Sequence, residues 1–332
     1  MPTTTIDRRR FVKSAGRGAL ALLARGAITE PQAARAALQE ALVPEIDGDF
    51  WTVADNPDLG PLTGPEQQPV DFGMWRAADG TWQLWSCIRS TKAPGKTRLF
   101  YRWQARRLTD RDWTPKGVAL TADPRVGETQ GGLQAPFVLK VGATYYMLYG
   151  DWEHICLATS VDGKAFVRQG TKSGGSGMFS DVPGGNTRDP MVLAYSKRYY
   201  CYTTAHLRGK GAVYCCVSTD LRHWSASTIV SAGGSSGTGP SSAECPLVYH
   251  HERTRLFYLF RTQRYGRDSE TRVYASPDPL DFGVHDDRYL LVTLAIAAPE
   301  IVQHDDRLYV AYLRPALNGI RMARLRFAPR QC

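Results

Sequence analysis

The chain has 332 residues, of which 43% are hydrophobic, so it is long enough to bury a large core. Its net charge is +9, but six of the basic residues and a single acid fall within residues 1–28. The other Lys and Arg residues are scattered and form no run that could follow a phosphate backbone, so we expect no nucleic-acid partner.

The N-terminal segment resembles an export signal. Residues 7–13 read Asp-Arg-Arg-Arg-Phe-Val-Lys, which is similar to the twin-arginine pattern. The apolar stretch at 18–24 is too short to cross a bilayer, so no membrane span is predicted. A basic tail before a helix is the alternative, because Thr29-Glu30-Pro31-Gln32 is typical of a helix start. We expect 1–28 to be a leader for periplasmic or secreted delivery and 29–48 to be a linker or short helix.

One pattern occurs five times between about residue 71 and the end of the chain. Each copy opens on a short apolar segment and continues through a turn into an aromatic strand. If residues 71, 135, 189, 244 and 298 are equivalent, the steps between copies are 64, 54, 55 and 54 residues. Such a period is typical of a β-propeller. The aromatic strands are predicted at 82–85, 145–149, 199–202, 256–260 and 308–312.

Each copy has room for four strands. A third strand follows the aromatic one, and three copies then have a turn that ends on an aromatic residue, the first at 160–166. We therefore predict an all-β protein, a five-bladed β-propeller of four-stranded antiparallel blades, over residues 49–332. Phe50-Trp51-Thr52-Val53 would close the ring against the last blade, and no large helical domain is expected after the first 50 residues.

Acidic residues open three of the five copies. The first strand of each propeller blade lines the central axis, so these positions converge on one funnel. They are Asp71, Asp189 and Glu244, and carboxyls brought together in this way can cleave a glycosidic bond. A structural role is the alternative for each of them; Asp189, for example, could form an ion pair with Arg188. Glu244 lies in an apolar stretch, where an unused and unpaired charge would be costly.

Two of these motifs resemble those of known enzymes. Arg188-Asp189-Pro190 and Glu244-Cys245-Pro246 resemble the Arg-Asp-Pro and Glu-Cys-Pro motifs of glycoside hydrolase family 32, the invertase, levanase and inulinase family. The aromatic repeats with their Ser-x-Asp turns are equally similar to family 43, the arabinanases and xylosidases, which share the five-bladed fold. The resemblance covers about residues 70–327.

The resemblance implies hydrolysis of an oligo- or polysaccharide, with a retaining course favoured. It implies that Asp189 stabilises the transition state and that Glu244 is the acid/base. The nucleophile motif of family 32 is Asn-Asp-Pro-Asn-Gly, whereas this chain has Pro69-Val70-Asp71-Phe72-Gly73. Asp71 occupies the matching place in its copy, without the flanking Asn and Pro, and is the candidate nucleophile.

Several other residues are candidates for sugar binding. Trp152 could stack on a sugar ring and His154 could bind a hydroxyl, although both could simply pack at a strand end. Glu300 follows Ala298 by two places and shares its strand face, with packing as the alternative. His206 and Gln263 follow second strands. The full predicted substrate-binding set is Trp75, Gln134, Trp152, His154, Arg188, Arg261 and Glu300.

The cysteines give no sign of a metal site. There are seven, an odd number, with no Cys-x-x-Cys pair and no Cys/His cluster at zinc-ligand spacing. Most fall inside predicted strands, where a thiol packs as a small apolar group. We therefore predict no cofactor and no metal ligands, while the sequence leaves open a structural cation such as calcium and the oligomeric state.

Two other classes of function use the same fold elements. A non-catalytic carbohydrate-binding propeller is favoured if Asp71 points away from the funnel. Another carbohydrate-active propeller, such as a sialidase-like enzyme or a glycoside phosphorylase, is the third reading. A sialidase needs six blades, and a phosphorylase needs a basic pocket for phosphate, which Arg188 and Arg261 alone do not establish.

Overall fold

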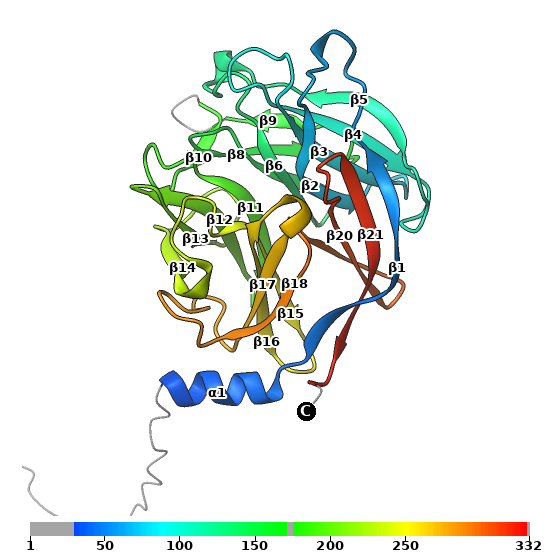
Figure 1. Cartoon of the computed structure of the whole chain (residues 1–332). Helices are drawn as coiled ribbons and strands as arrows, with labels where there is room; N and C mark the ends of the chain where they lie inside the picture. Colours follow the sequence, from blue (N-terminus) through cyan, green and yellow to red (C-terminus); the bar gives the residue numbers. More distant parts are fainter. Residues whose placement is uncertain (1–29, 171–174, 331–332) are drawn as a thin grey trace, which may run out of the picture.

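The computed structural model describes residues 30–170 and 175–330. Its strands form five antiparallel sheets round a central axis (Figure 1). The inner strand of each sheet contacts the inner strands of its two neighbours, and the fifth returns to the first, so the sheets form a closed ring. The predicted five-bladed propeller is confirmed.

Blades 1 and 2 follow one another along the chain. Blade 1 consists of β2 (Gln68–Arg76), β3 (Trp82–Arg89), β4 (Leu99–Ala105) and β5 (Thr114–Leu120). Blade 2 consists of β6 (Gln134–Val141), β7 (Thr144–Gly150), β8 (Ile155–Ser160) and two short strands, β9 (Val167–Gln169) and β10 (Gly177–Phe179). Both short strands pair with β8, so together they take the place of a fourth strand.

Blades 3 and 4 have the same order of strands. Blade 3 consists of β11 (Arg188–Tyr195), β12 (Arg198–Leu207), β13 (Lys210–Ser218) and β14 (Thr228–Ala232). Blade 4 consists of β15 (Glu244–His251), β16 (Leu256–Arg264), β17 (Glu270–Ser276) and β18 (Leu290–Leu294).

Blade 5 joins the two ends of the described chain. It consists of β19 (Glu300–His304), β20 (Arg307–Leu313), β21 (Gly319–Ala328) and, as its outer strand, β1 (Val43–Asp55). β1 pairs antiparallel with β21 from Val43 opposite Ala328 to Asp55 opposite Gly319. The predicted closing segment at 50–53 lies inside β1, but the strand begins earlier, within the stretch that we expected to be a linker or helix.

A single α-helix is described, α1 (Glu30–Glu40). It lies outside the ring, where Ala34 and Ala37 are buried against blade 4 (Figure 1). The backbone N–H of Leu42, which follows the helix, donates to the Tyr258 hydroxyl at 3.0 Å. No helix in the described ranges is long and apolar enough to cross a membrane. The export leader predicted at 1–28 lies outside the described residues.

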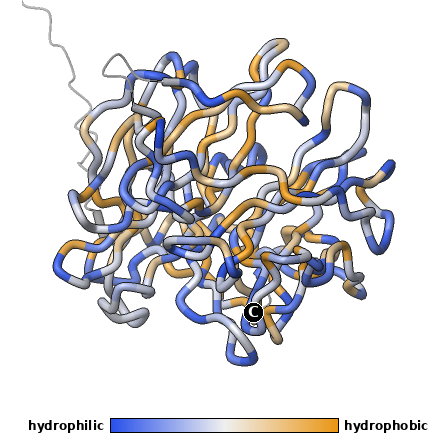
Figure 2. The backbone as a smooth tube through the Cα atoms, turned by 90° about the horizontal axis from the view of Figure 1, so that it is seen from above, coloured by the Kyte–Doolittle hydropathy of each residue, from blue (hydrophilic) through white to orange (hydrophobic). Residues whose placement is uncertain are grey.

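The core lies between the blades. The aromatic second strands supply much of it: Tyr145, Tyr149, Tyr202, Tyr258 and Phe260 are all less than 2% exposed. Large aromatic side chains bury much apolar area at a low cost in rotamer freedom, which suits blades that pack face to face. Hydrophobic segments run through the body of the molecule in Figure 2, while many hydrophilic ones lie at its turns.

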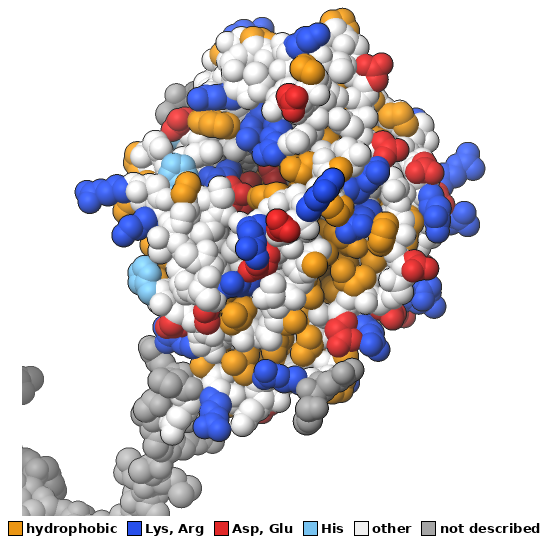
Figure 3. Space-filling model, viewed as in Figure 1, with side chains coloured by type: hydrophobic (Ala, Val, Ile, Leu, Met, Phe, Trp, Pro, Cys, Tyr) orange, Lys and Arg blue, Asp and Glu red, His pale blue; other side chains and the backbone are white. Residues whose placement is uncertain are grey.

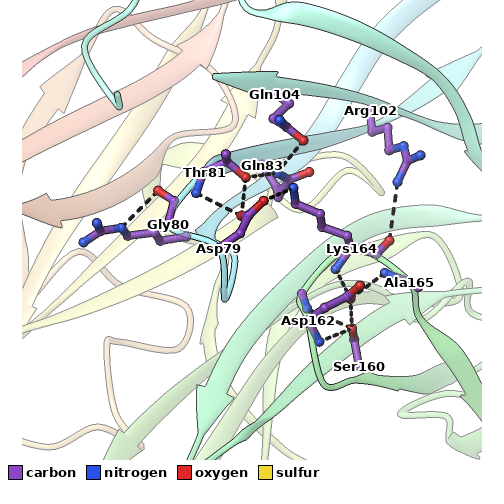
Figure 4. A network of polar contacts seen from close by, with 12 residues as sticks. Asp79, Gly80, Thr81, Gln83, Arg102, Gln104, Ser160, Asp162, Lys164 and Ala165 are labelled. Carbon is purple, nitrogen blue, oxygen red and sulfur yellow. Dashed lines mark hydrogen bonds and ion pairs between the residues drawn. The ribbon is translucent and has the colours of Figure 1, made fainter. Parts of the chain in front are cut away.

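Polar turns also connect blades. The Ser160 hydroxyl accepts hydrogen bonds from the backbone N–H groups of Asp162 and Gly163, which shapes the turn after β8. Lys164, on the same turn, forms an ion pair with Asp79 of blade 1 (Figure 4). The indole of Trp75 donates to the Gly163 carbonyl at 2.7 Å. This turn therefore fixes the outer part of blade 2 against blade 1.

The inner strands share an irregularity at their openings. Asp71, Ala135, Asp189, Cys245 and Ala298 all have positive φ, between 34° and 55°, and the strand pairing of the first four blades is interrupted at this point. Such a bulge twists the strand and re-aims side chains. Left-handed backbone at five non-glycine residues costs energy that the surrounding ladder must offset, and such strain clusters at functional sites.

This irregularity corrects the predicted alignment of the copies. By backbone conformation Cys245, not Glu244, is equivalent to Asp71 and Asp189, while Glu244 is equivalent to Arg188 and Gln134. The two acids of the similar tripeptides therefore occupy adjacent positions in the blade repeat. Because neighbouring residues on a strand point in different directions, they approach the axis at different angles.

Candidate active site

A cavity of about 350 Å³ lies where the inner strands begin. Asp71 from blade 1, Asp189 from blade 3 and Glu244 from blade 4 all line it, so three acids far apart in sequence meet at one place. Figure 3 shows a hollow on this face with acidic side chains inside it and Lys and Arg side chains near its edge. The lining residues are Val70, Asp71, Arg89, Arg98, Gln134, Asn186, Arg188, Asp189, His206, Pro240, Ser241, Glu244 and Tyr265.

Asp71 and Asp189 lie next to one another at the floor of this cavity. Cys245 lies between them, with its sulfur 3.2 Å from Oδ1 of Asp71 and 3.8 Å from Oδ2 of Asp189. The backbone N–H of Cys245 also donates to Oδ2 of Asp189 at 3.1 Å. The left-handed backbone at Cys245 thus lets one residue donate to both carboxylates.

Arg188 orients the third acid. Its Nη2 donates to Oε1 of Glu244 at 2.7 Å, and its Nε lies 3.8 Å from Oδ2 of Asp189. The guanidinium is itself held by the carbonyl of Asn186 at 2.9 Å. A charge-assisted hydrogen bond of this length is strong, so Glu244 has a defined position even though it is close to the cavity.

The three carboxyls have unusual proton affinities. The pKa of Asp189 is raised to about 6, mainly by burial and then by the nearby charge of Asp71, against the opposing effect of Arg188. Burial also raises the pKa of Glu244, while Arg188 lowers it. The pKa of Asp71 is raised by burial and lowered by Arg98. Carboxyls that differ in their neighbours and share one site can divide into proton donors and ionised groups.

Three buried acceptor oxygens at this site have no hydrogen-bond partner in the described protein. They are Oε1 of Gln134, Oδ1 of Asn186 and Oδ1 of Asp189. Gln134 and Asp189 are at most 5% exposed, and all three residues line the cavity. Leaving a buried acceptor unpaired costs about 1–3 kcal/mol, so a ligand rich in hydroxyl donors would bind here favourably.

Glu300 lies deeper along the axis. It lines a narrow cavity of about 20 Å³ together with Asp71, Asp189 and Cys245, but it does not line the larger one. Burial alone raises the pKa of Glu300, to about 8. The position fits the packing alternative raised for it above, since the space beside it is smaller than a sugar.

Two of the predicted binding residues lie away from the cavity. Trp75 is 6% exposed and packs against Trp85 and Phe166. Arg261 is 1% exposed, donates to the Ser231 hydroxyl and the Gly233 carbonyl, and lies over the Tyr274 ring at 4.9 Å. Both side chains therefore hold blades together, and their placement differs from the prediction because strand ends were taken as pocket-facing without knowing the side-chain direction.

Trp152 and His154 lie beside the site but do not line it. The Trp152 ring has Lys96 and Arg98 over it, at 4.6 and 5.2 Å from its centre, so cations take the place predicted for a sugar ring. His154 is exposed, with Nδ1 3.6 Å from Oδ1 of Asp151. Gln134 and Arg188 do line the cavity, as does His206.

Sequence reasoning did not identify several lining residues. Arg89 ends β3 and Arg98 precedes β4, so both lie at the same end of blade 1 as Asp71. Asn186 lies two residues before Arg188, and Tyr265 follows β16. These residues could have been predicted from their place in the repeat. The second strand of each blade ends at the same end of the propeller where the inner strands begin, so residues just beyond a second strand lie near the site.

One set of donor atoms is compact enough to hold a metal ion. The carboxylate oxygens of Asp71 and Asp189 and the sulfur of Cys245 lie within 4.8 Å of one another. Two carboxylates and a neutral thiol form a mixed set, and burial raises the pKa of Cys245 well above its usual value, which keeps the thiol protonated and a poor ligand.

A larger groove of about 790 Å³ lies elsewhere, between α1 and the C-terminal residues Pro329 and Arg330. Glu40 is its single acid among the described lining residues. It therefore offers no pair of carboxyls for acid–base chemistry, and the cavity on the propeller axis remains the candidate active site.

Sequence comparison finds no matching family model and no matching curated protein. Comparison of structures finds the same fold in glycoside hydrolases. A thermostable family-43 glycoside hydrolase is 16% identical with a TM-score of 0.57, over 79% of this chain and 90% of that one. The GH32 β-fructofuranosidase BmSUC1 of Bombyx mori is 17% identical with a TM-score of 0.58, over 87% of this chain and 64% of that one.

A third structure is similar to the same extent. An exo-1,5-α-L-arabinanase from a bovine ruminal metagenomic library is 16% identical with a TM-score of 0.56, over 77% of this chain and 92% of that one. At these identities the likeness shows a shared fold. The protein thus has the five-bladed propeller fold of glycoside hydrolase families 32 and 43, as its motifs and repeats predicted.

Proposed function

We propose that the protein is a glycoside hydrolase in which Asp71, Asp189 and Glu244 carry the reaction. The observation that supports this most is the meeting of three carboxyls from three blades in one cavity, each with a raised pKa. Strongly perturbed acids in a cleft are typical of catalytic sites. The fold of the similar structures is compatible with this activity but does not by itself establish it.

Glu244 acts as the general acid in this proposal. Burial keeps its carboxyl protonated to higher pH than usual, so it can give a proton to the departing sugar oxygen. Arg188 holds the carboxyl in place by donating to its Oε1. After the leaving group departs, the ionised Glu244 is stabilised by the same arginine and can accept a proton from the incoming water.

Asp71 acts as the nucleophile. The cation of Arg98 and the thiol of Cys245 favour its ionised form, against the effect of burial. Asp189 stabilises positive charge on the sugar and binds its hydroxyls; its Oδ1 has no hydrogen-bond partner among the described residues. Attack by Asp71 on the anomeric carbon forms a glycosyl ester, and water then cleaves it, so the anomeric configuration is retained.

The substrate in this proposal is a carbohydrate. Buried acceptors at Gln134, Asn186 and Asp189 suit the hydroxyl donors of a sugar. The cavity of about 350 Å³ is large enough for one or two sugar units.

Incubation of the purified protein with plant, algal and microbial glycans tests the proposal. Released sugar in the wild type, and none from Glu244→Gln or Asp71→Asn, is the expected result. Proton NMR of the first product gives the anomeric configuration, and inversion would remove the nucleophile role of Asp71. Tight glycan binding by the wild type with no product from any glycan would favour the non-catalytic propeller instead.

We also propose that hydrolysis needs no metal. Asp71 and Asp189 are already oriented by the thiol and backbone of Cys245 and by Arg188. Dialysis against EDTA should therefore leave turnover unchanged. Loss of turnover, with recovery on adding calcium or another single cation, would contradict this and would point to the Asp71, Asp189 and Cys245 donor set.

A further inference from the structure

The candidate active site has basic as well as acidic residues, and we call Arg89 and Arg98 together its basic wall. Three arginines line the same cavity as Asp71, Asp189 and Glu244: Arg89, Arg98 and Arg188. Arg188 already has an acidic partner, because its Nη2 lies 2.7 Å from Oε1 of Glu244. Arg89 and Arg98 have no such partner: among the described residues, neither forms an ion pair, and both come from blade 1.

Arg98 is half-buried with few partners. Its one side-chain hydrogen bond in the described protein goes to the Cys87 sulfur, a weak acceptor, at 3.8 Å. Its guanidinium lies over the Trp152 ring, which it shares with Lys96. A guanidinium carries five N–H donors, so most of those on Arg98 are unused.

The loop that carries Arg98 is held rigidly. The backbone N–H of Arg98 donates to the Gly131 carbonyl of the neighbouring blade at 2.9 Å. The backbone N–H of Lys96 donates to the Gln130 carbonyl, also at 2.9 Å. Gly131 has a φ of +64°, and a Cβ there would come within 2.3 Å of the Pro94 carbonyl. This close approach of two loops positions the two cations before any ligand binds.

Arg89 is similarly available. Its Nε and Nη2 donate to a neutral acceptor, Oε1 of Gln68, at 3.0 and 2.6 Å. This contact orients the guanidinium, which forms no ion pair with a carboxylate in the described ranges. Arg89 and Arg98 both lower the pKa of Asp71, so both lie near enough for their fields to reach the cavity floor.

A neutral sugar does not explain this arrangement. Hydroxyl groups are recognised by amides, carboxylates and single donors, all of which the cavity already has. Two arginines with free donors suit an oxyanion, because the guanidinium fork matches a carboxylate or sulfate in shape and charge. Asp71 and Asp189 supply part of the counter-charge for Arg98. No carboxylate in the described ranges hydrogen-bonds to either guanidinium, so a bound anion would fill donors that the acids leave unused.

We propose that Arg89 and Arg98 form a subsite for a carboxylate or sulfate group carried by the sugar, so that the substrate is an acidic glycan. This deepens the proposed function and rests on it for the cleavage step, but the binding step can be tested alone. Lys96 at the rim extends the same positive potential, which would draw an acidic glycan toward the cavity.

Binding is measured with the Glu244→Gln protein, in which cleavage is expected to be blocked. The probes are oligouronides and their carboxyl-reduced counterparts, and sulfated oligosaccharides and their desulfated counterparts, in calorimetric titrations. One acidic member should bind at least tenfold more tightly than its neutral partner, and the difference should shrink with salt. Which pair shows the difference identifies carboxylate or sulfate as the group.

The arginine variants locate the effect. Adding Arg98→Gln or Arg89→Gln should reduce the preference for the acidic probe several-fold and leave the affinity for the neutral probe nearly unchanged. Arg98→Lys keeps a cation and should therefore retain part of the preference for the acidic probe. Arg107→Gln, at an exposed ion pair with Asp110, is the matched control and should change nothing. Melting temperatures are measured for each variant, so that loss of fold is not mistaken for loss of binding.

Several outcomes would overturn the inference. Equal affinity for acidic and neutral probes would do so, as would an equal loss of both in the arginine variants. Turnover that requires inorganic phosphate and yields a sugar phosphate would assign the arginines to a co-substrate. Cleavage of neutral glycans alone would refute the anion subsite and support the hydrolase activity. Binding of acidic glycans without cleavage by the wild type would support the subsite and refute the hydrolase activity.

Discussion

The thiol of Cys245 lies 3.2 Å from Oδ1 of Asp71, so a residue of the fourth blade contacts the proposed nucleophile of the first. The same sulfur lies 3.2 Å from the Tyr265 hydroxyl. Burial raises the pKa of the thiol well above its usual value, so it stays protonated and can donate to the carboxylate. A cysteine in this position acts through Asp71 and is a positioning residue.

Cys245→Ala should therefore change the pH profile as well as the rate. The thiol favours the ionised form of Asp71, so its removal should raise the pKa of that carboxyl. The acid limb of the rate profile should then move to higher pH, with turnover reduced about tenfold. Cys245→Ser keeps a donor and should lie close to the wild type. A rate loss without any movement of the acid limb would contradict the assignment.

Glu244→Gln and Asp71→Asn should each lower turnover by about three or more orders of magnitude. Both changes keep the shape of the side chain, so the melting temperature should stay nearly the same. Glu66→Gln, on the surface, serves as the control. Near-normal turnover in either variant on a cleaved substrate would show that the residue has been given the wrong role.

Glu300 should make the stability depend on pH. Burial raises its pKa from the ordinary 4.5 to about 8 in the folded protein. The folded state therefore holds this proton more tightly than the unfolded state, and stability should fall as pH rises through the window from about 4.5 to about 8. Below that window both states are protonated and the effect is absent.

Glu300→Gln removes the charge and should stabilise the protein at pH 9 by up to about 5 kcal/mol, with little effect at pH 4. Urea unfolding of both proteins at the two pH values measures the difference, since the free energy of unfolding is obtained at each pH. Equal free energies of unfolding for the wild type and Glu300→Gln at pH 9 would mean that Glu300 is solvated or paired in the folded protein.

Arg261 should matter for stability and not for binding. Arg261→Met leaves the Ser231 hydroxyl and the Gly233 carbonyl without their buried donor, which costs roughly 1–3 kcal/mol. Because Arg261 does not line the cavity, glycan affinity of the folded variant should equal that of the wild type. A selective loss of affinity at unchanged stability would restore the predicted binding role.

We expect export to depend on the predicted leader at residues 1–28. Replacing Arg8 and Arg9 with Lys should leave the protein in the cytoplasm if residues 7–13 act as a twin-arginine signal. Cell fractionation with an antibody to the folded domain measures this. Unchanged periplasmic or extracellular delivery of the double variant would refute the signal.

Repetition made the fold predictable. The five aromatic strands recur at a nearly constant period, and each is the second strand of a blade, as Tyr145–Tyr149 is in β7. Local pattern suffices here because a strand of large aromatic residues must be covered on both faces, and five such units cover one another when they close into a ring. The same pattern placed Asp71, Asp189 and Glu244 at inner-strand openings.

Side-chain direction was decided by the tertiary structure. Left-handed backbone occurs at each opening, with interrupted strand pairing in the first four blades, and no residue type marks it, since Asp, Ala and Cys all occur there. This conformation made Cys245 the equivalent of Asp71. Packing between blades buried Trp75 and Arg261, and the connection from β3 to β4 brought Arg89 and Arg98 to the acids. Period and composition depend on neighbours along the chain, whereas the basic wall depends on how two loops from different blades meet in space.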